Sequence, residues 1–560
     1  MAYIVKQKTN KNRINIFLAE NHYISDKKSP RQTRKYLGFL RANTDELLLA
    51  GNQSGPTEEI LSLLSKKGIK YLGNKASAPG RKTTDSSRNV SRTKIQSLLD
   101  KATIVETGRV QAFRELSIES GLMNSLCHAF GNSEASKIFA IATFQASEGM
   151  PLYLAADFAD DTGIEEGLSS SNISKVVSKI GLDDACINRF FVAWIKECGK
   201  PKSVVHDTTS ISSYSSKCEE VEWGYNRDGE KLAQINLSLV AARESRLPLW
   251  YRLIPGSIPD VSSLKLTCKI LTSLGLKDFS FSLDRGYFSS SNISELRKTN
   301  IGFTIGLPHT NKQYKQLVRE NLKYLEMNSS SFLAGKKVMR HALSTIAFPS
   351  GEKSPIILPA HVFLDTEKRE VESRLLEMNV LELQAKAANM EFKTEQSALI
   401  WIEENSGPMA KLFETKKSGM RYCVVKNVSE VQDAINSMGM FIIVKSKEGD
   451  TASEVLSEYK CRDLAEKIFD NLTNGIGFER FRTSKSEQIN GRAFIAFVSV
   501  ILRVLFENKL RSAGLLSKYT VDEALSKLRK IKQLLVGEIG YVPKEIPKQS
   551  REIFSAICKK

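Results

Sequence analysis

In the middle of the chain, apolar residues form short runs of strand length, separated by two segments with a helical period. The five strand-like runs, SVVHD, AQINLSLVAA, PLWYRLI, FSFSLD and GFTIGL, are residues 203–207, 233–242, 248–254, 279–284 and 302–307. The helical segments cover about 261–274 and 290–299. This order of three strands, helix, strand, helix and strand predicts an α/β fold with a mixed sheet.

The pattern on both sides of this region is helical. From about 95 to 198, apolar residues repeat every three or four positions, which predicts a domain of several short helices. The same period returns over 453–472. The longest apolar run, 493–506, has only 14 residues and contains Arg503. It is too short to span a bilayer and predicts a buried helix.

One stretch of the helical region, LSSSNISKVVSKIGL at 168–182, begins with a serine cluster typical of a helix N-cap. Its apolar positions fit a helix packed against other helices. A DNA-reading helix of a helix-turn-helix is the alternative that the pattern leaves open.

The N-terminal region has a different pattern. Residues 1–40 alternate between apolar and polar side chains, with lysines and arginines among the polar ones, and predict a small basic β-element. Residues 71–94 are rich in Ser, Thr, Gly, Lys and Arg and show no hydrophobic period. They predict a flexible basic linker.

Charge is concentrated at the two ends of the 560-residue chain. The whole chain carries 81 Lys+Arg and 63 Asp+Glu, a net charge of 81 − 63 = +18. Residues 1–100 contribute 19 − 8 = +11 and residues 501–560 contribute 13 − 6 = +7, so the remainder is neutral. Basic ends favour a polyanionic partner, nucleic acid before membrane, over ordinary solvated surface charge. The eight cysteines form no CxxC pair, which argues against a zinc site and a disulfide framework and favours a reducing cytoplasm.

Three acids are candidates for chemistry. Asp207 and Asp284 end two of the predicted strands, and open α/β sheets bind ligands at the carboxyl ends of their strands. Glu466, on the helical stretch at 453–472, could complete a cation site. Two divalent cations held by carboxylates can activate an attacking oxygen and stabilise the leaving oxygen of a phosphodiester. Taken singly, an Asp at the end of a strand is more often a turn former or a helix cap, and a Glu on a helix is more often a solvated side chain.

The residues around these acids form an ordered set. Four stretches come first: HDTTS (206–210), GYNRDGEKLAQINLSLVA (224–241), LPLWYRLIPGSIPD (247–260) and LDRGYFS (283–289). They are followed by Tyr459, Arg462 and Glu466 at Tyr-x2-Arg-x3-Glu spacing. This set resembles the insertion-sequence DDE transposases of the insertion-sequence-4 superfamily, which carry a Tyr-Arg-Glu-Lys signature, and within it the 1634 branch. The resemblance covers roughly residues 201–307 and 440–505.

The resemblance implies an RNase H-like mixed-sheet core, a large, partly β insertion and a helical DNA-binding domain. Asp207, Asp284 and Glu466 would form the catalytic, metal-binding triad. Tyr459 and Arg462 would contact transposon-end phosphates from one face of the same helix as Glu466. The expected segments are a basic β-containing element at 1–70, the linker at 71–94, the helical DNA-binding domain at 95–200, the core at 201–307 and 451–510, the insertion at 308–450 and a basic helical tail at 511–560.

The function implied is that of a bacterial transposase. It would bind the terminal inverted repeats of an insertion sequence, cut DNA at the element ends and join the 3′-OH ends to target DNA. Mg²⁺ or Mn²⁺, two ions per active site, would be the cofactor. A homodimer in the synaptic complex, no membrane partner, and a cytoplasmic, nucleoid-associated location are expected. The alternatives are a metal-dependent DNA endonuclease without strand transfer and a catalytically inactive transposase-derived DNA-binding protein.

Some residues depart from this pattern or have a simpler explanation. The lysine of the signature falls on Thr473, with Lys467 nearby and Lys485 or Arg480 as replacements. His206 is expected to be structural. Trp223, Trp250 and Trp401 could stack on a flipped base, but burial in the core is the expectation for each.

Overall fold

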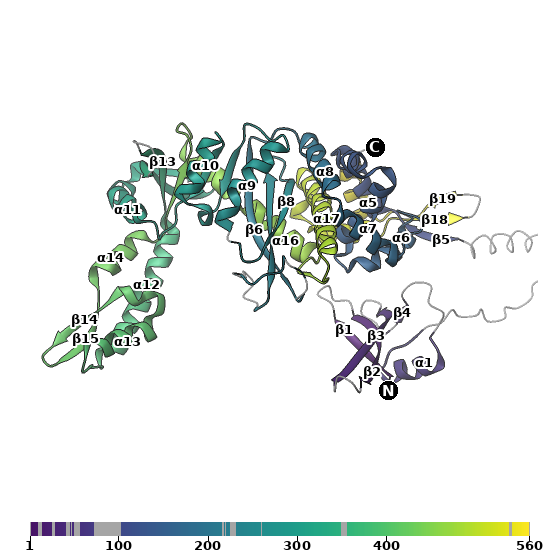
Figure 1. Cartoon of the computed structure of the whole chain (residues 1–560), viewed down its shortest axis with the longest axis horizontal. Coiled ribbons are helices and arrows are strands. Elements are labelled where there is room, and N and C mark those ends of the chain that lie inside the picture. The colour runs from purple at the N-terminus through teal and green to yellow at the C-terminus, as the bar shows by residue number, and fades with distance from the viewer. Residues whose placement is uncertain are drawn as a thin grey trace, which may run out of the picture. The chain divides into compact units, whose positions relative to one another are not determined.

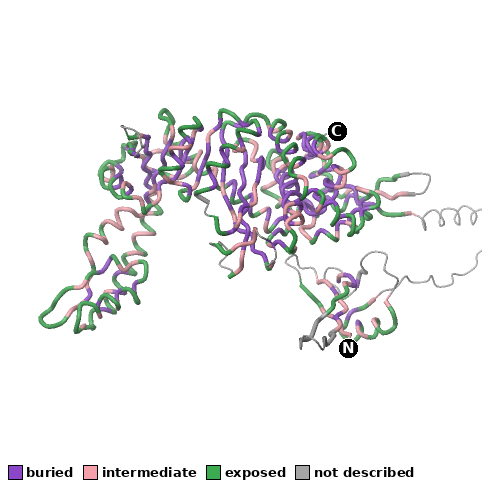
Figure 2. Tube along the Cα trace, viewed as in Figure 1, coloured by how far each residue is buried: buried purple, intermediate pink, exposed green. Residues whose placement is uncertain are grey.

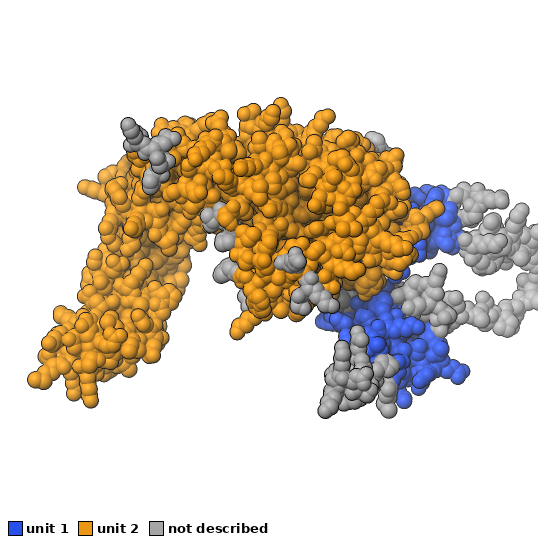
Figure 3. Space-filling view, in the orientation of Figure 1, with its two compact units in different colours: residues 1–105, 156–163, 533–544 blue, residues 106–155, 164–532, 545–560 orange. Residues whose placement is uncertain are grey.

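The structure is a computed structural model that forms two compact units (Figure 3). It describes residues 2–8, 14–24, 29–40, 45, 47–49, 56–71, 102–215, 218, 220–224, 231–258, 260–348, 355–536 and 540–558. Unit 1 comprises residues 1–105, 156–163 and 533–544, and unit 2 comprises 106–155, 164–532 and 545–560. Apart from Tyr71, the predicted linker at 71–94 lies outside the described residues.

In the N-terminal part of unit 1, the described residues form a four-stranded antiparallel sheet and a helix that packs on it. Its strands are β1 (Ala2–Lys8), β2 (Ile14–Ile24), β3 (Ser29–Leu40) and β4 (Leu47–Leu49), in that order. Helix α1 (Glu58–Lys66) packs on the sheet, and the shared core contains Ile4, Ile16, Leu37, Leu40, Leu47, Leu64 and Ile69. The alternation seen in the sequence therefore places apolar side chains on the face that α1 covers.

A ten-stranded mixed sheet is the centre of unit 2. The expected strands are present as β6 (Ser203–Ser213), β7 (Gln234–Ala242), β8 (Pro248–Pro255), β9 (Ser280–Leu283) and β10 (Gly302–Gly306). β6, β9 and β10 are mutually parallel, whereas β7 and β8 run antiparallel to their neighbours. The expected helices are α9 (Asp260–Ser273) and α10 (Ser290–Lys298). The mixed α/β class is confirmed.

The segment predicted to be an insertion also contributes to this sheet. Beyond β10, the sheet continues through β16 (Met440–Lys445), β13 (Ile356–Asp365), β12 (Lys337–Phe348) and β11 (Ser331–Ala334). β17 (Arg480–Phe481) pairs with β6 off this path. The boundaries 308 and 450 therefore do not separate the sheet from an inserted domain, because β16 pairs directly with β10.

Only the part between β13 and β16 forms a separate projection (Figure 1). It contains α12 (Thr366–Ala388), α13 (Glu395–Ser406), the hairpin β14 (Phe413–Ser418) and β15 (Arg421–Lys426), and α14 (Val428–Ser437). This projection has its own hydrophobic cluster, which includes Val380, Leu383, Ile402 and Leu412.

The helical region packs around one long helix, α17 (Ser486–Ser512), which is buried along most of its length (Figure 2). Helices α3 (Gly108–Glu119), α5 (Asn132–Glu148) and α7 (Ser170–Leu182) contact it. α7 and α17 approach so closely that a Cβ on Gly491 would overlap the carbonyl oxygen of Val177. The apolar face of the serine-capped stretch is therefore used for packing.

α17 is the one described helix long and apolar enough to cross a membrane, but 83% of its most apolar 18-residue stretch is buried inside the protein. This burial is typical of the core helix of a folded domain and confirms the predicted buried helix. The C-terminal segment after α17 contains α18 (Val521–Leu528) and α19 (Lys548–Ile557), and also the strands β18 (Lys532–Val536) and β19 (Gly540–Pro543). The tail predicted to be helical therefore contains helices and also two strands.

Candidate active site

Two aspartates lie side by side at the centre of the mixed sheet. Parallel strands β6 and β9 pair with His206 opposite Leu283. Asp207, the next residue of β6, and Asp284, which directly follows β9, therefore emerge at the same level from neighbouring positions. Both aspartates are partly buried. The apolar residues that precede them, such as Val205 and Leu283, are fully buried and fix this arrangement.

Glu466 reaches the same place from α16 (Asp463–Asp470), which packs against β6 and β7. Leu464, Ala465, Ile468 and Phe469 are the buried side chains of this helix. Glu466 stays exposed and faces a cavity of about 370 Å³, lined by His206, Asp207, Asp284, Arg462, Glu466 and Phe469. We call this the acidic cavity. The three acids singled out in the sequence share it.

Arg462 partly balances the negative charge of the acidic cavity. Its Nη1 donates a hydrogen bond to Oδ1 of Asp284, and its guanidinium lies 4.9 Å from the centre of the Tyr459 ring. Burial disfavours the charged guanidinium, but electrostatic attraction to Tyr459, Asp284 and Glu466 outweighs this cost and raises the pKa of Arg462. The arginine is therefore a fixed positive charge between the acids and the tyrosine.

A family model described as "Transposase DDE domain" matches residues 199–502, which is more than half of the chain and contains all three acids. The chain belongs to the DDE transposase family. The prediction of a DDE transposase enzyme is confirmed, and membership of the family implies that its activity depends on a divalent metal ion.

A solved structure is also similar to this transposase, the cryo-EM structure of the piggyBac transposase synaptic complex with hairpin DNA. The two chains are 9% identical, the match covers 71% of this chain and 70% of the other, and the TM-score is 0.35. No curated protein matches the sequence.

The helix expected to carry Tyr459, Arg462 and Glu466 on one face is two helices. α15 (Ala452–Lys460) ends before Cys461, and Arg462 is the N-cap of α16. Tyr459 consequently packs against Gly306 of β10, where a Cβ would overlap its hydroxyl, and it does not line the acidic cavity. Burial raises the pKa of Tyr459. The tyrosine contacts the site through Arg462.

His206 lies in the wall of the acidic cavity but is used for packing. Its Nε2 hydrogen-bonds with Oγ of Ser238 at 2.8 Å, and its ring lies 4.9 Å from that of Tyr287. Complete burial lowers the pKa of His206 to about 3, so the imidazole is neutral near pH 7. The expected structural role is confirmed.

Thr473, at the position of the signature lysine, lies in a π-helical turn, Asn471–Gly475, that continues α16. Its hydroxyl donates to the carbonyl oxygen of Phe469 at 3.0 Å. Neither suggested replacement lines the acidic cavity: Arg480 stacks on Tyr214, and Lys485 is the N-cap of α17. Of the described residues that line this cavity, Arg462 is the one lysine or arginine.

The three tryptophans differ in exposure. Trp250 is buried in β8, and Trp401 packs against the hydrophobic cluster of the projection. Trp223 is 70% exposed, so the expectation of burial was wrong for this residue.

The donor set of the acidic cavity fits the metal dependence that the family implies. Carboxylate oxygens are the ligands that hard divalent cations prefer, and three acids can suffice because such ions retain several waters. As the side chains stand, no three His, Cys, Asp or Glu residues within the described part of the chain are grouped as ligands of one ion. Arg462 occupies Oδ1 of Asp284, so a metal ion at this carboxylate would bind Oδ2 or compete with the guanidinium for Oδ1.

Proposed function

We propose that this transposase binds the terminal inverted repeats of an insertion sequence, cleaves DNA at the element ends and joins the 3′-OH ends to target DNA. The observation that carries the proposal is the convergence of Asp207, Asp284 and Glu466, from β6, β9 and α16, on one cavity. The ordered motifs around these residues support a place in the insertion-sequence-4 superfamily, in its 1634 branch, with an RNase H-like core.

In this proposal the three carboxylates are the metal-binding triad, and the cofactor is Mg²⁺ or Mn²⁺, with two ions per site. Bound ions would supply Lewis-acid activation of the attacking oxygen and charge stabilisation of the leaving oxygen. Asp207 and Asp284 are held by neighbouring strands and Glu466 by a packed helix, so the protein presents its donors from rigid elements.

Arg462 and Tyr459 act on the DNA backbone in this scheme. The Arg462 guanidinium, which lies beside Asp284, would donate to a phosphate oxygen of the transposon end. The Tyr459 ring beneath the guanidinium limits its movement, so the arginine stays next to the acids. Tyr459 is thus a positioning residue for Arg462.

The assembly and its location follow from the same scheme. Two transposon ends must be held together, so we propose a homodimer in the synaptic complex. The basic ends of the chain support binding to DNA and a cytoplasmic, nucleoid-associated location, with no membrane partner.

The test incubates the purified full-length protein with a DNA fragment that carries the inverted repeats flanking its gene, a supercoiled target and Mg²⁺ or Mn²⁺. End cleavage and joined products are expected, and both should disappear in Asp207→Asn, Asp284→Asn and Glu466→Gln. Asp470→Asn is the matched control, because Asp470 is exposed on α16 and does not line the acidic cavity. Cleavage without joining would identify an endonuclease, and activity that survives a triad substitution would refute the triad.

A further inference from the structure

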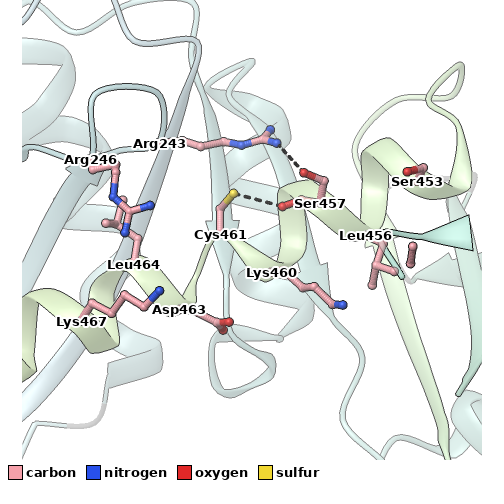
Figure 4. A pocket seen from close by; sticks show the side chains of 12 residues that line it. Arg243, Arg246, Ser453, Leu456, Ser457, Lys460, Cys461, Asp463, Leu464 and Lys467 are labelled. Carbon is pink, nitrogen blue, oxygen red and sulfur yellow. Dashed lines mark hydrogen bonds between the residues drawn. The ribbon is translucent and has the colours of Figure 1, made fainter. Parts of the chain in front are cut away.

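A second cavity, of about 470 Å³, opens beside α16 (Figure 4). Arg243 and Arg246 reach it from the turn between β7 and β8, and Lys460 and Lys467 reach it from α15 and α16. The other residues that line it are Ala334, Gly335, Ser453, Leu456, Ser457, Cys461, Asp463 and Leu464. We call it the basic cavity.

The cations of the basic cavity are not neutralised by the protein. Four positive side chains face one acid, Asp463, and none of the four forms an ion pair with a residue that the structure describes. Arg243 is held in place by a neutral partner, since its Nη2 donates to Oγ of Ser457 at 3.2 Å. Like charges gathered in one hollow repel each other, and an anionic ligand removes that repulsion.

Arg246 occupies its place at a conformational cost. Its φ is +61°, in the left-handed region that side chains with a Cβ rarely adopt. The other described residues of this kind that are not glycine are Asp278 and Asn300, whose short polar side chains tolerate the region. A glycine would fit the turn without strain, so the structure keeps a long cation where the backbone disfavours one.

Helix α16 connects the two cavities. Glu466 faces the acidic cavity and the next residue, Lys467, faces the basic one. Consecutive residues of a helix point about 100° apart, so one helix presents metal-binding acids on one side and cations on another. An α-helix with its side chains is about 10–12 Å across, so the cavities on two sides of α16 are separated by the length of a few nucleotides.

We propose that the basic cavity binds adjacent phosphates of the DNA backbone next to the acidic cavity and thereby positions the strand that is cut. This inference rests on the proposed function, because it requires DNA at the acidic cavity. The two arginines offer planar forks that match phosphate oxygens, and the two lysines add mobile point charges. Such contacts fix position and carry no sequence information.

The experiment compares Lys460→Gln/Lys467→Gln with the control pair Lys298→Gln/Lys323→Gln. All four lysines are exposed, and both pairs remove the same charge, but only the first pair lines the basic cavity. Fluorescence anisotropy with two labelled duplexes, one carrying the inverted repeat and one of unrelated sequence, is recorded over a range of salt concentrations. Each lost phosphate contact reduces affinity by about eightfold near 0.1 M salt.

For the first pair we expect affinity for both duplexes to fall by about ten- to a hundredfold. The slope of log affinity against log salt concentration should become smaller by about two. Values equal to those of the control pair would overturn the inference. A loss confined to the inverted-repeat duplex would also overturn it, because it would indicate recognition of bases. Arg246→Gly provides a second variant that removes a cation without straining the fold, and it should weaken binding to both duplexes equally.

The two proposals fail in different ways. If the unmodified protein neither binds nor cleaves DNA that carries the inverted repeats, the proposed function is wrong. If it cleaves this DNA while the first pair keeps the affinity and salt dependence of the control pair, only the role of the basic cavity is wrong.

Discussion

The acidic and basic cavities lie on two sides of the same short helix. They differ in whether their charged side chains have partners of opposite charge within the protein. In the acidic cavity the protein supplies a counter-charge, since Arg462 pairs with Asp284. In the basic cavity the four cations face a single acid, Asp463. In the acidic cavity, a metal ion would compete with Arg462 for Oδ1 of Asp284. A site with unpaired charges is ready for an anion. In our proposal the acidic cavity carries out the chemistry and the basic cavity attaches the DNA.

The largest effect is expected from removing a carboxylate in the acidic cavity. Asp207→Asn, Asp284→Asn and Glu466→Gln should each lower the rate of end cleavage by at least about a thousandfold, because a metal ligand is lost. DNA affinity should be unchanged or a few-fold tighter, since one negative charge near the phosphates is removed. Gel assays of cleavage and anisotropy measurements of binding, made on the same preparations, check both parts. A variant that loses binding together with cleavage would contradict the division between the cavities.

The reverse pattern is expected for the basic cavity. Lys460→Gln/Lys467→Gln should bind DNA about ten- to a hundredfold more weakly, but its single-turnover cleavage rate at saturating DNA should stay within about tenfold of the unmodified rate. The reason is that these lysines hold DNA away from the reacting phosphate. Cleavage rates measured over a range of protein concentrations separate a loss of DNA affinity from a loss of the cleavage rate itself. A cleavage rate reduced as strongly as in the triad variants would show that the cations act on the chemical step.

A smaller effect is expected at Arg462, where the two functions meet. Arg462→Gln should bind Mn²⁺ about fivefold more tightly in the absence of DNA, because the ion no longer competes with a half-exposed ion pair at Asp284. Cleavage should nevertheless fall, since a phosphate contact is lost. The rise of the unfolding temperature with Mn²⁺ concentration measures the metal affinity. Arg480→Gln, which removes a cation outside the acidic cavity, should leave this affinity unchanged.

The pairing of Asp207 with Asp284 could be predicted from local sequence, whereas Glu466, 466 − 284 = 182 positions after Asp284, was placed with them by the family resemblance. The apolar runs that end in Asp207 and Asp284 mark two strands, and neighbouring parallel strands bring their carboxyl ends together. The break between α15 and α16 could not be predicted, because apolar residues such as Leu456, Leu464 and Ile468 keep a helical period across it. α15 is held by a contact with a residue far away in the sequence: Ser282 Oγ donates a hydrogen bond to the carbonyl oxygen of Glu458 at 3.0 Å.

The basic cavity and the extended sheet were missed for a related reason. Arg243 and Lys460 are 460 − 243 = 217 positions apart, and nothing in either local sequence indicates the other. Likewise, the apolar residues of β12 and β13 are compatible with strands but do not reveal the sheet that these strands join, since pairing partners are chosen by tertiary packing. Trp223 was expected in the core because aromatic residues are often buried, and only the fold shows that it is exposed.

The smallest effect, and the sharpest separation of stability from function, is expected at Arg246. A residue with a Cβ in the left-handed region costs about 1–2 kcal/mol, and glycine loses part of this advantage through its greater freedom in the unfolded chain. Arg246→Gly should therefore raise the free energy of unfolding of unit 2 by about 0.5–1 kcal/mol while DNA affinity falls several-fold. Urea denaturation and anisotropy measure the two quantities.

Asn300→Gly is the control: it changes a residue that tolerates this backbone, so it should gain less stability and leave DNA binding unchanged. If Arg246→Gly gains stability and keeps its DNA affinity, then Arg246 does not contact the DNA backbone. The basic cavity would then depend on Arg243, Lys460 and Lys467.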